Sequence, residues 1–487
     1  MKHMWRPCQF FSISLPAGYQ LQAADEKAIL WGKRPRRQMT ISRSLADCLQ
    51  KLLQNDVDYV CNQAEAAALF TLAAKGYLQI TNKTGDRLAW EENVPLVSVI
   101  IPVKDRPEDI RDCLTSIFQI QWPKEKLEVI VVDDGSQDDT PTVAEALGAK
   151  VIRRQQSGGP SIARNLGAKT AQGEILAFLD SDCTVDAGWL LELIPWLLAP
   201  GIGGVGGFVA SYYRTSQLDR YEEAMSSLSM GKRLLYEAAG EGNFYVPTCN
   251  LLVKKTVYEE MNGLNPEMHL GEDVDFCWRM RSAGYGLLYV TVGRAWHKHR
   301  NVLGQMLKRR MQYGTSEADL YGRHRDKKKR FPLPLAAVLF YLGILLTILL
   351  WQPLCLSFSV AGLVWSFFRK KQLARKLQQS IAWRELLGVS WRSACAFCYY
   401  LNFHIIRYYL ILCCLLACFL PSLWLVIFIM LISCSLVDYF IKKPRMNFFS
   451  FLFFYLLEQV YYQIGVLLGC FQHHYFCCYR VHWLVSF

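Results

Sequence analysis

The stretch ILAFLDSDC at residues 175–183 decides the fold class of this 487-residue chain. Five apolar residues precede two carboxylates, Asp180 and Asp182, that are separated by a single serine. A short, unbroken apolar run is typical of a strand that is buried on both faces of a parallel sheet. We therefore expect both carboxylates at the carboxyl end of a strand, where open α/β sheets bind their ligands.

The segments around this strand alternate between strand and helix patterns. We predict further strands over 96–103, 127–132 and 150–153, and helices over 109–119, from 140 onward and over 160–170. This alternation predicts an α/β domain with an open, Rossmann-like sheet, to which we assign residues 91–330. The strand over 127–132 runs into Asp133 and Asp134, so a second carboxylate pair is expected at the same edge.

The pair Asp180 and Asp182 has the spacing to hold a hard divalent cation through oxygen ligands. Such a cation neutralises nucleotide phosphates and helps a diphosphate to leave. Downstream of Gly158 and Gly159, a helix begins whose N-terminus can receive a phosphate, with Arg164 about one turn inside it. Ordinary turn and helix-start chemistry is the alternative for each motif taken alone.

Two later clusters add candidate chemistry. GEDVD at 271–275 offers a carboxylate as a general base toward an acceptor hydroxyl. Its alternative is a helix start with acidic residues in the first turn. The segment WHKH at 296–299 offers a third metal ligand or a contact to a diphosphate, and it leaves His297 and His299 as alternatives.

Residues 331–487 are predicted to form a membrane domain with four or five transmembrane helices. The candidate spans are 333–350, 354–368, 395–420, 422–441 and 448–470. The basic clusters lie at 323–330, 369–376 and 442–445. If all three face the cytoplasm, the first four spans form two hairpins and the fifth carries the C-terminus to the other side.

Three further expectations concern this membrane domain. Residues 379–392 are predicted to form an amphipathic helix at the membrane surface. Arg407 and Glu458 fall within candidate spans and are expected either to snorkel or to pair with each other. The net charge of +12 is concentrated in this apolar third, which suits anchoring at a membrane and gives no indication of a nucleic-acid partner.

Residues 1–90 are predicted to form a small, separate α+β module that is winged-helix-like. It would contain a strand pair over 28–42, a helix from Ser44, a helix over 63–75 and a strand over 77–81. An extension that stabilises the sheet domain is the alternative. The seven cysteines before residue 330 form no CxxC pair, so we expect no disulfide framework, no zinc site and a reducing, cytoplasmic location for this part.

The order of these motifs resembles the family 2 glycosyltransferases with a GT-A fold over about residues 95–325. The segments that carry the resemblance are VSVIIPVKDR (97–106), VVDDGS (131–136), GGPSIARNLGA (158–168), AFLDSDC (177–183), PTCNLLVKK (247–255) and GEDVDFCWRM (271–280). The resemblance implies an inverting, membrane-associated hexosyltransferase of the cell (inner) membrane. It would use a nucleotide sugar and Mg²⁺ or Mn²⁺, with its catalytic domain in the cytoplasm.

The resemblance also implies roles for individual residues. On the nucleotide side it implies Pro102, Asp105, Asp133, Asp134, Arg164, Asn165 and Asp180. For the metal it implies Asp182 and His297. Asp273 is implied as the catalytic base, supported by Glu272. On the acceptor or diphosphate side we place Asn250, Asp275, Arg309 and Arg310.

A narrower resemblance involves KRRMQYGTSEADLYGRH (308–324), the GEDVD cluster and the N-terminal module, which together look like the mycofactocin-type glycosyltransferases. It implies peptide recognition by the module, UDP-glucose as donor and a small peptide-derived redox cofactor as acceptor. A polysaccharide synthase and a lipid-phosphate glycosyltransferase are the alternatives, with a glycan or lipid acceptor. A non-enzymatic membrane scaffold is a further alternative, against which the intact acidic motifs argue.

Overall fold

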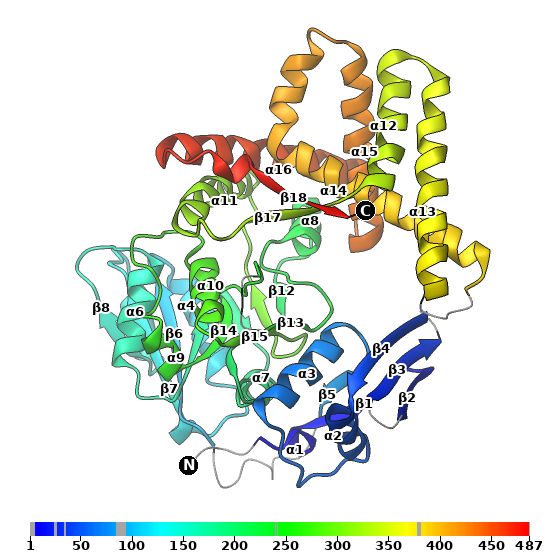
Figure 1. Ribbon diagram of the computed structural model, residues 1–487. Helices are drawn as coiled ribbons and strands as arrows, with labels where there is room; N and C mark the ends of the chain where they lie inside the picture. The colour runs from blue at the N-terminus through cyan, green and yellow to red at the C-terminus, as the bar shows by residue number, and fades with distance from the viewer. Residues whose placement is uncertain are drawn as a thin grey trace. The chain divides into compact units, whose positions relative to one another are not determined.

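The computed structural model describes residues 5–23, 27–33, 36–83, 94–238, 240, 242–376 and 381–486 (Figure 1). The chain divides into two compact units. Unit 1 contains Met1–Tyr212 and Ser227–His299, and unit 2 contains Tyr213–Ser226 and Arg300–Phe487. The expected boundary between residues 90 and 91 lies outside the described residues.

An eight-stranded sheet forms the centre of unit 1, in the order β13-β15-β11-β14-β9-β6-β7-β8. Its strands are β6 (Val97–Val103), β7 (Leu127–Asp133), β8 (Lys150–Arg153), β9 (Ile175–Leu179), β11 (Ile202–Gly206), β13 (Leu235–Glu237), β14 (Asn250–Lys254) and β15 (Gly286–Tyr289). The four strands predicted from sequence are parallel neighbours. Strand β14 runs antiparallel to both of its neighbours, so the complete sheet is mixed, with a Rossmann-like parallel half.

Both faces of this sheet are covered by helices. Successive residues of a strand point to opposite faces, so Val99 and Ile101 join one apolar core and Ile100 joins the other. The first core includes side chains of α4 (Pro107–Ile117), α5 (Thr140–Ala146) and α7 (Trp189–Leu197). The second includes those of α6 (Pro160–Thr170), α9 (Lys255–Glu260) and α10 (Glu272–Ser282). This double cover explains the unbroken apolar runs of the strands.

A small second sheet lies beside the large one in the order β10-β16-β12. Strand β10 (Cys183–Val185) follows the DSD motif directly, and it pairs antiparallel with β16 (Ala295–His297). Strand β12 (Val209–Ser211) pairs with the other edge of β16 in parallel. The chain segment after residue 290 is thereby held next to the segment that carries Asp182.

The N-terminal module contains two small antiparallel sheets and three helices. Its elements are α1 (Pro7–Phe10), β1 (Phe11–Ser14), β2 (Tyr19–Ala23), β3 (Lys27–Lys33), β4 (Arg36–Ser42), α2 (Arg43–Leu53), α3 (Gln63–Ala74) and β5 (Gln79–Asn82). The predicted strand pair is present as β3 and β4, with β2 as an additional edge strand. The N-cap of α2 lies two residues earlier than predicted, because Ser42 rather than Ser44 accepts the capping hydrogen bond from Leu45 N.

Aromatic side chains pack the module against the sheet domain within unit 1. The ring of Trp196 on α7 lies 4.3 Å from that of Phe11 and 6.0 Å from that of Phe70, measured between centroids. The indole Nε1 of Trp196 donates to Asn82 Oδ1 at 3.0 Å, and the Trp5 indole donates to Pro195 O. All three packed rings are nearly inaccessible to solvent, so the contact is a shared core rather than a surface touch.

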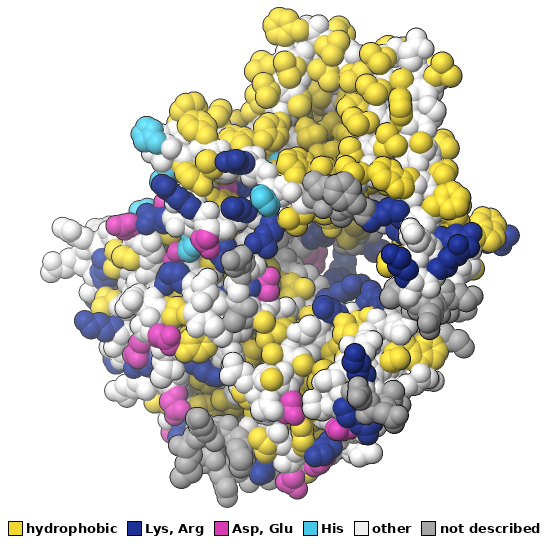
Figure 2. All heavy atoms as spheres, viewed as in Figure 1, with side chains coloured by type: hydrophobic (Ala, Val, Ile, Leu, Met, Phe, Trp, Pro, Cys, Tyr) yellow, Lys and Arg dark blue, Asp and Glu magenta, His cyan; other side chains and the backbone are white. Residues whose placement is uncertain are grey.

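Unit 2 is built mainly from long helices. They are α8 (Gln217–Met225), α11 (Leu303–Arg323), α12 (Leu335–Leu350), α13 (Leu356–Lys376), α14 (Trp383–Ala417), α15 (Ser422–Lys442) and α16 (Phe448–Gln472). Among the described residues, α14, α15 and α16 are long and apolar enough to cross a membrane, and α12 is a shorter apolar helix. Figure 2 shows apolar side chains covering the outside of the hairpins α12–α13 and α14–α15. This exterior indicates association with a membrane.

The structure corrects two expectations about unit 2. Residues 383–417 form one continuous helix, α14, instead of a surface helix followed by a separate span, and residues 379 and 380 lie outside the described part. The second correction concerns the C-terminus. Strand β18 (Val481–Ser486) pairs in parallel with β17 (Lys329–Pro334), so the chain end lies beside the 323–330 basic cluster, not on the far side.

Helix α16, which corresponds to the predicted fifth span and is long and apolar enough to cross a membrane, packs along α11. Added Cβ atoms at Gly314, Gly465 and Gly469 would collide with backbone of the opposite helix, which shows how closely the two helices approach. Figure 1 shows α16 lying across the base of the two upright hairpins. The pairing alternative for the two charges is confirmed, because Arg407 Nη1 lies 3.6 Å from Glu458 Oε1.

Candidate functional site

Two carboxylate pairs meet at the carboxyl edge of the parallel strands. Strand β9 ends at Leu179, directly before Asp180, and strand β7 ends at Asp133. Strand β6 lies between them in the sheet, with Val103 opposite Asp133. The shared edge is the one at which open α/β sheets bind ligands.

Asp182 lies at the meeting point of three segments and is nearly inaccessible to solvent. Its Oδ2 accepts a hydrogen bond from Arg106 Nη1 at 2.7 Å, and its Oδ1 lies 3.5 Å from His297 Nε2. The pairing of β10 with β16 explains the second contact, since Cys183 is opposite His297 in the register. The backbone N–H of Lys298 also donates to Asp182 O at 2.8 Å.

The structure separates the two histidines that the sequence left as alternatives. His297 faces Asp182, whereas the Nδ1 of His299 lies 2.7 Å from Ser211 Oγ on the neighbouring strand β12. His299 is buried in that position. Of the two, His297 is the candidate metal ligand.

The donor set around Asp182 suits a divalent cation. A carboxylate oxygen and an imidazole nitrogen 3.5 Å apart are close enough to ligate one ion. The residues present therefore fit the metal that the sequence motif suggests.

Arg164 connects the DSD motif to the GEDVD cluster. From inside α6, its Nη2 donates to Asp180 Oδ1 at 2.5 Å and its Nη1 donates to Glu272 Oε1 at 3.0 Å. Burial alone would lower the pKa of Arg164, but the two carboxylates raise it above its ordinary value. Arg164 thus stays charged and fixes two acids that are 92 positions apart in sequence.

Asp273 is the second residue of α10, one position after Glu272. Burial raises the pKa of Asp273 to about 7, and the adjacent carboxylate of Glu272 raises it as well. The backbone N–H of Val274 donates to Asp273 Oδ1 at 2.8 Å. A carboxylate with a pKa near neutrality is suited to accept a proton from a hydroxyl group.

Asp134 organises the loop that leads into α6. It accepts hydrogen bonds from Arg154, Ser157 Oγ and the N–H groups of Gly158 and Gly159. Burial alone would raise the pKa of Asp134, but these hydrogen bonds and the charge of Arg154 hold it below the usual value. Its neighbour Asp133 accepts from Ser136 N at 3.2 Å.

Pro102 and Asp105 stand at the end of β6. Pro102 is half-buried and opposite Val132 in the register. Asp105 is exposed and has a φ of 50°, an unusual value for a residue other than glycine. Its N–H donates to Ser136 Oγ and its Oδ1 accepts from Gln137 N, so it fastens the two loops at this edge to each other.

Three of the residues singled out from sequence have their polar groups committed to the fold. Asn165 is bonded to the backbone of Leu264 and to the Tyr258 hydroxyl. Asn250 accepts from the Trp189 indole and donates to Gly293 O. Asp275 holds Arg279, which in turn donates to two loop carbonyls. We therefore assign them to positioning the loops around the site.

Comparison with known proteins shows the family of the α/β domain. The family described as glycosyl transferase family 2 matches residues 98–261. Glycosyltransferase AglE of Haloferax volcanii is 31% identical over 244 residues, which cover 49% of this chain and 78% of AglE. The chain belongs to glycosyl transferase family 2.

A second relative in this family is the pre-mycofactocin glycosyltransferase of Mycobacterium tuberculosis, which is 34% identical over 235 residues. The match covers 47% of this chain and 48% of that protein, so the chain spans about half the length of this relative. Among solved structures, the mannosyltransferase PcManGT from Pyrobaculum calidifontis in complex with GDP-Man and Mn²⁺ aligns at 17% identity. Its TM-score is 0.39, with 81% of this chain and 98% of that chain covered.

Sequence reasoning did not single out Arg106 in this family 2 domain. Besides Asp182, its Nη1 contacts Asp109 Oδ2 at 3.3 Å, and its backbone N–H donates to Thr140 Oγ1. The available signal was its position in VKDR at the end of a buried strand, on the same edge as the carboxylates. Its partner lies 76 residues away, so only the fold reveals the pair.

The expected diphosphate role of Arg310 is not supported by its surroundings in unit 2. The side chain is 5% exposed, with Nη2 2.6 Å from Glu222 Oε1 and Nε 3.3 Å from Glu458 Oε2. Removing one partner of such a buried pair is expected to destabilise the fold, because it leaves a carboxylate buried without its countercharge. Arg309 is half-buried on the same helix, with its guanidinium 5.0 Å from the centroid of the Tyr313 ring.

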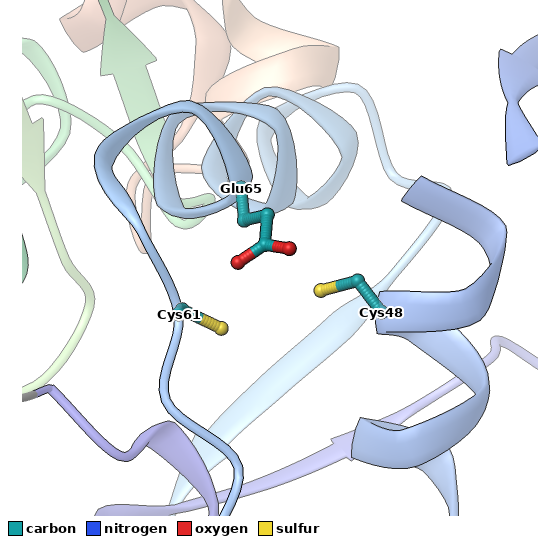
Figure 3. Close-up of side chains that lie close together, drawn as sticks. All are labelled: Cys48, Cys61 and Glu65. Atoms are coloured by element: carbon teal, nitrogen blue, oxygen red, sulfur yellow. The ribbon is translucent and has the colours of Figure 1, made fainter. Parts of the chain in front are cut away.

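In the N-terminal module, Cys48, Cys61 and Glu65 come together, although their spacing in sequence gave no such indication (Figure 3). Their ligand atoms lie within 4.8 Å of one another, as in a metal site. Both carboxylate oxygens of Glu65 already accept hydrogen bonds, one from Asn62 N in a capping box and one from the Tyr59 hydroxyl. The capping of α3 therefore accounts for the position of Glu65.

Proposed function

We propose that this protein is a membrane-associated inverting glycosyltransferase that moves a hexose from a nucleotide sugar to an acceptor hydroxyl. The observation that carries the proposal is the approach of Asp182 and His297 at the same sheet edge as Asp180, which Arg164 connects to Glu272. Family membership supports the reaction class. Three long apolar helices support the membrane association.

In the proposed mechanism, Asp133, Asp180 and the loop ordered by Asp134 bind the nucleoside. Asp182 and His297 would hold Mn²⁺ or Mg²⁺, which neutralises the charge of the departing diphosphate. Asp273 accepts the proton of the acceptor hydroxyl as its oxygen attacks the anomeric carbon and the nucleoside diphosphate leaves from the opposite face. A single displacement of this kind inverts the anomeric configuration.

We further propose UDP-glucose as donor and a peptide-derived redox cofactor as acceptor. The support is the similarity to a protein named pre-mycofactocin glycosyltransferase, over about half of its length. The N-terminal module supplies a second argument, since its three-stranded sheet has two edge strands, β2 and β4. A peptide can bind such an edge by adding a strand.

The direct test is to incubate membranes that contain the full chain with several radiolabelled nucleotide sugars and candidate acceptors. We expect a labelled product with one hexose or a few, formed only with a divalent cation. Asp182→Asn should abolish transfer, while Asp186→Asn, a nearby carboxylate on the loop after β10, should retain it. Full transfer by Asp182→Asn would contradict the site.

The chemical nature of the product separates the acceptor classes. Label on a small peptide-derived molecule supports the proposed acceptor, and label in the organic phase would instead identify a lipid phosphate. A long polymer would identify a polysaccharide synthase. Either of the last two results contradicts the proposed acceptor while leaving the transferase site intact.

A further inference from the structure

A cavity of about 370 Å³ lies within unit 2, between helices α12, α13 and α14. One part of its wall is apolar and includes Ala336, Ala337 and Leu363. Another part is polar and includes Ser366 and Ser393. The volume falls in the range of small-molecule sites, and none of the residues used in the transferase site lines the cavity.

Three cationic side chains of α13 line this cavity, namely Arg369, Lys370 and Lys376. The ammonium group of Lys370 donates to Ser366 Oγ and Ser393 Oγ, both at 3.0 Å, and to Val389 O at 3.3 Å. These acceptors are neutral. Within the described part of the chain, none of the three cations forms an ion pair with a carboxylate.

Additional positive charge lies close to this group. Burial lowers the pKa of Lys370, and the like charges of Arg369 and Arg392 lower it further. Cations that converge without a neutralising carboxylate repel one another, and a bound anion removes that repulsion. The cavity therefore has the electrostatic character of an anion site.

The position of the cations along α13 indicates which kind of anion fits. The helix carries no charged residue from Leu356 to Phe368, and the apolar side chains of Val360, Val364 and Phe368 expose 60%, 48% and 59% of their surface. The cations begin at the next residue, Arg369. Figure 2 shows dark-blue side chains gathered at this end of α13, below the apolar surface of the hairpin. This is the arrangement in which a lipid's chains lie on apolar side chains while its phosphate reaches basic ones.

We propose that the cavity between α12, α13 and α14 binds the phosphate headgroup of an anionic membrane phospholipid. Arg369 and Lys376 contact the phosphate, and Lys370, whose three N–H groups are donated to Ser366, Ser393 and the backbone of Val389, contributes its positive charge. The acyl chains pass over the exposed apolar side of α13. This site is separate from the proposed transferase centre and does not depend on the identity of the acceptor.

The test uses the full-length protein in detergent, titrated with phosphatidylglycerol and, separately, with phosphatidylcholine. Native mass spectrometry counts the bound lipids, and thermal unfolding reports their effect. We expect retention of one phosphatidylglycerol and a rise in the unfolding temperature that phosphatidylcholine does not produce. The double variant Arg369→Gln/Lys370→Gln should weaken phosphatidylglycerol binding on the order of tenfold.

Lys371→Gln/Arg375→Gln is the matched control, because it removes one arginine and one lysine from the same helix without touching the cavity lining. It should bind phosphatidylglycerol like the unmodified protein. An equal loss of phosphatidylglycerol binding in both double variants would contradict a specific site and indicate nonspecific electrostatic attraction instead. Equal binding of phosphatidylcholine, or equally strong binding of soluble glycerol phosphate, would also overturn the proposal. Both measurements use the unmodified protein, so they do not depend on whether a variant folds.

Discussion

Arg106 donates a hydrogen bond of 2.7 Å to Asp182, the carboxylate that also faces His297. Arg106 bonds Oδ2 of this carboxylate, whereas Oδ1 is the oxygen that lies 3.5 Å from His297 Nε2. The guanidinium therefore already neutralises part of the negative charge that the proposed divalent cation would use. In this sense Arg106 and the cation would compete for the charge of one carboxylate.

Replacement of Arg106 by glutamine should tighten Mn²⁺ binding, because Asp182 loses its competing partner. A hydrogen bond between charged groups contributes about 1.5–3 kcal/mol, so an increase in affinity of at least about tenfold is expected. Isothermal titration with Mn²⁺ alone measures it. Arg111→Gln, on the exposed side of α4, is the control and should leave Mn²⁺ affinity unchanged. Weaker Mn²⁺ binding in Arg106→Gln would contradict the competition.

Transfer should depend on the protonation of Asp273. Its pKa is raised to about 7, so the unprotonated form that accepts a proton is the minor form below neutrality. We expect kcat/KM to rise about tenfold per pH unit below pH 6 and to level off above pH 8. Asp273→Asn should remove this dependence together with transfer, while UDP binding, measured by calorimetry, is retained. If Asp273→Asn lost UDP binding as well as transfer, the role of Asp273 would be structural instead of catalytic.

Arg310 should contribute to the stability of unit 2 and not to binding of the nucleotide sugar. Arg310→Met leaves Glu222 buried without its partner, which costs about 3–5 kcal/mol. Thermal unfolding in detergent should show the loss. The double variant Arg310→Met/Glu222→Gln should recover much of it, because Glu458 keeps its contact with Arg407. If Arg310→Met had an unchanged unfolding temperature and a raised KM for the nucleotide sugar, the result would instead support a role for Arg310 at the diphosphate.

Trp196→Ala should loosen the N-terminal module from the sheet domain. The indole is 2% exposed and is the common neighbour of Phe11 and Phe70, so its truncation should cost about 3–5 kcal/mol. Limited proteolysis should then release a fragment of about the first 90 residues faster than from the unmodified protein. Trp122→Ala truncates another buried indole, in the segment before β7, and should leave that release rate unchanged, so it distinguishes loosening of the module from general instability.

The local patterns of the chain were sufficient for the parallel half of the sheet. Unbroken apolar runs predicted β6, β7 and β9 to within one residue at each end, since burial on both faces requires apolar residues at every position. The Gly-Pro step predicted the start of α6, and the chain after β7 and β9 predicted carboxylates at one edge. The antiparallel strand β14 was missed, because pairing direction leaves no mark in a five-residue apolar run.

The site illustrates the limit of such patterns. Asp182 and His297 were each identified as candidates, but their approach depends on a strand pair between residues 114 positions apart. Asn165, Asn250 and Asp275 have the residue types of a binding site and are used to hold loops. A polar residue beside a motif has the same appearance in sequence whether its partner is a ligand or a distant backbone group.

By itself, the sequence determined the class of sheet, the edge at which acidic residues gather and the apolar character of the last third, because each depends on neighbours within a few residues. Only the tertiary structure decided which histidine faces Asp182, that Arg106 bonds the same carboxylate, and that Arg310 is buried between carboxylates. The structure also shows that the two predicted helices form one helix, α14, and that the C-terminal strand β18 pairs with β17. These features arise from contacts between segments far apart in the chain, where packing and charge pairing select one arrangement among many that the local pattern allows.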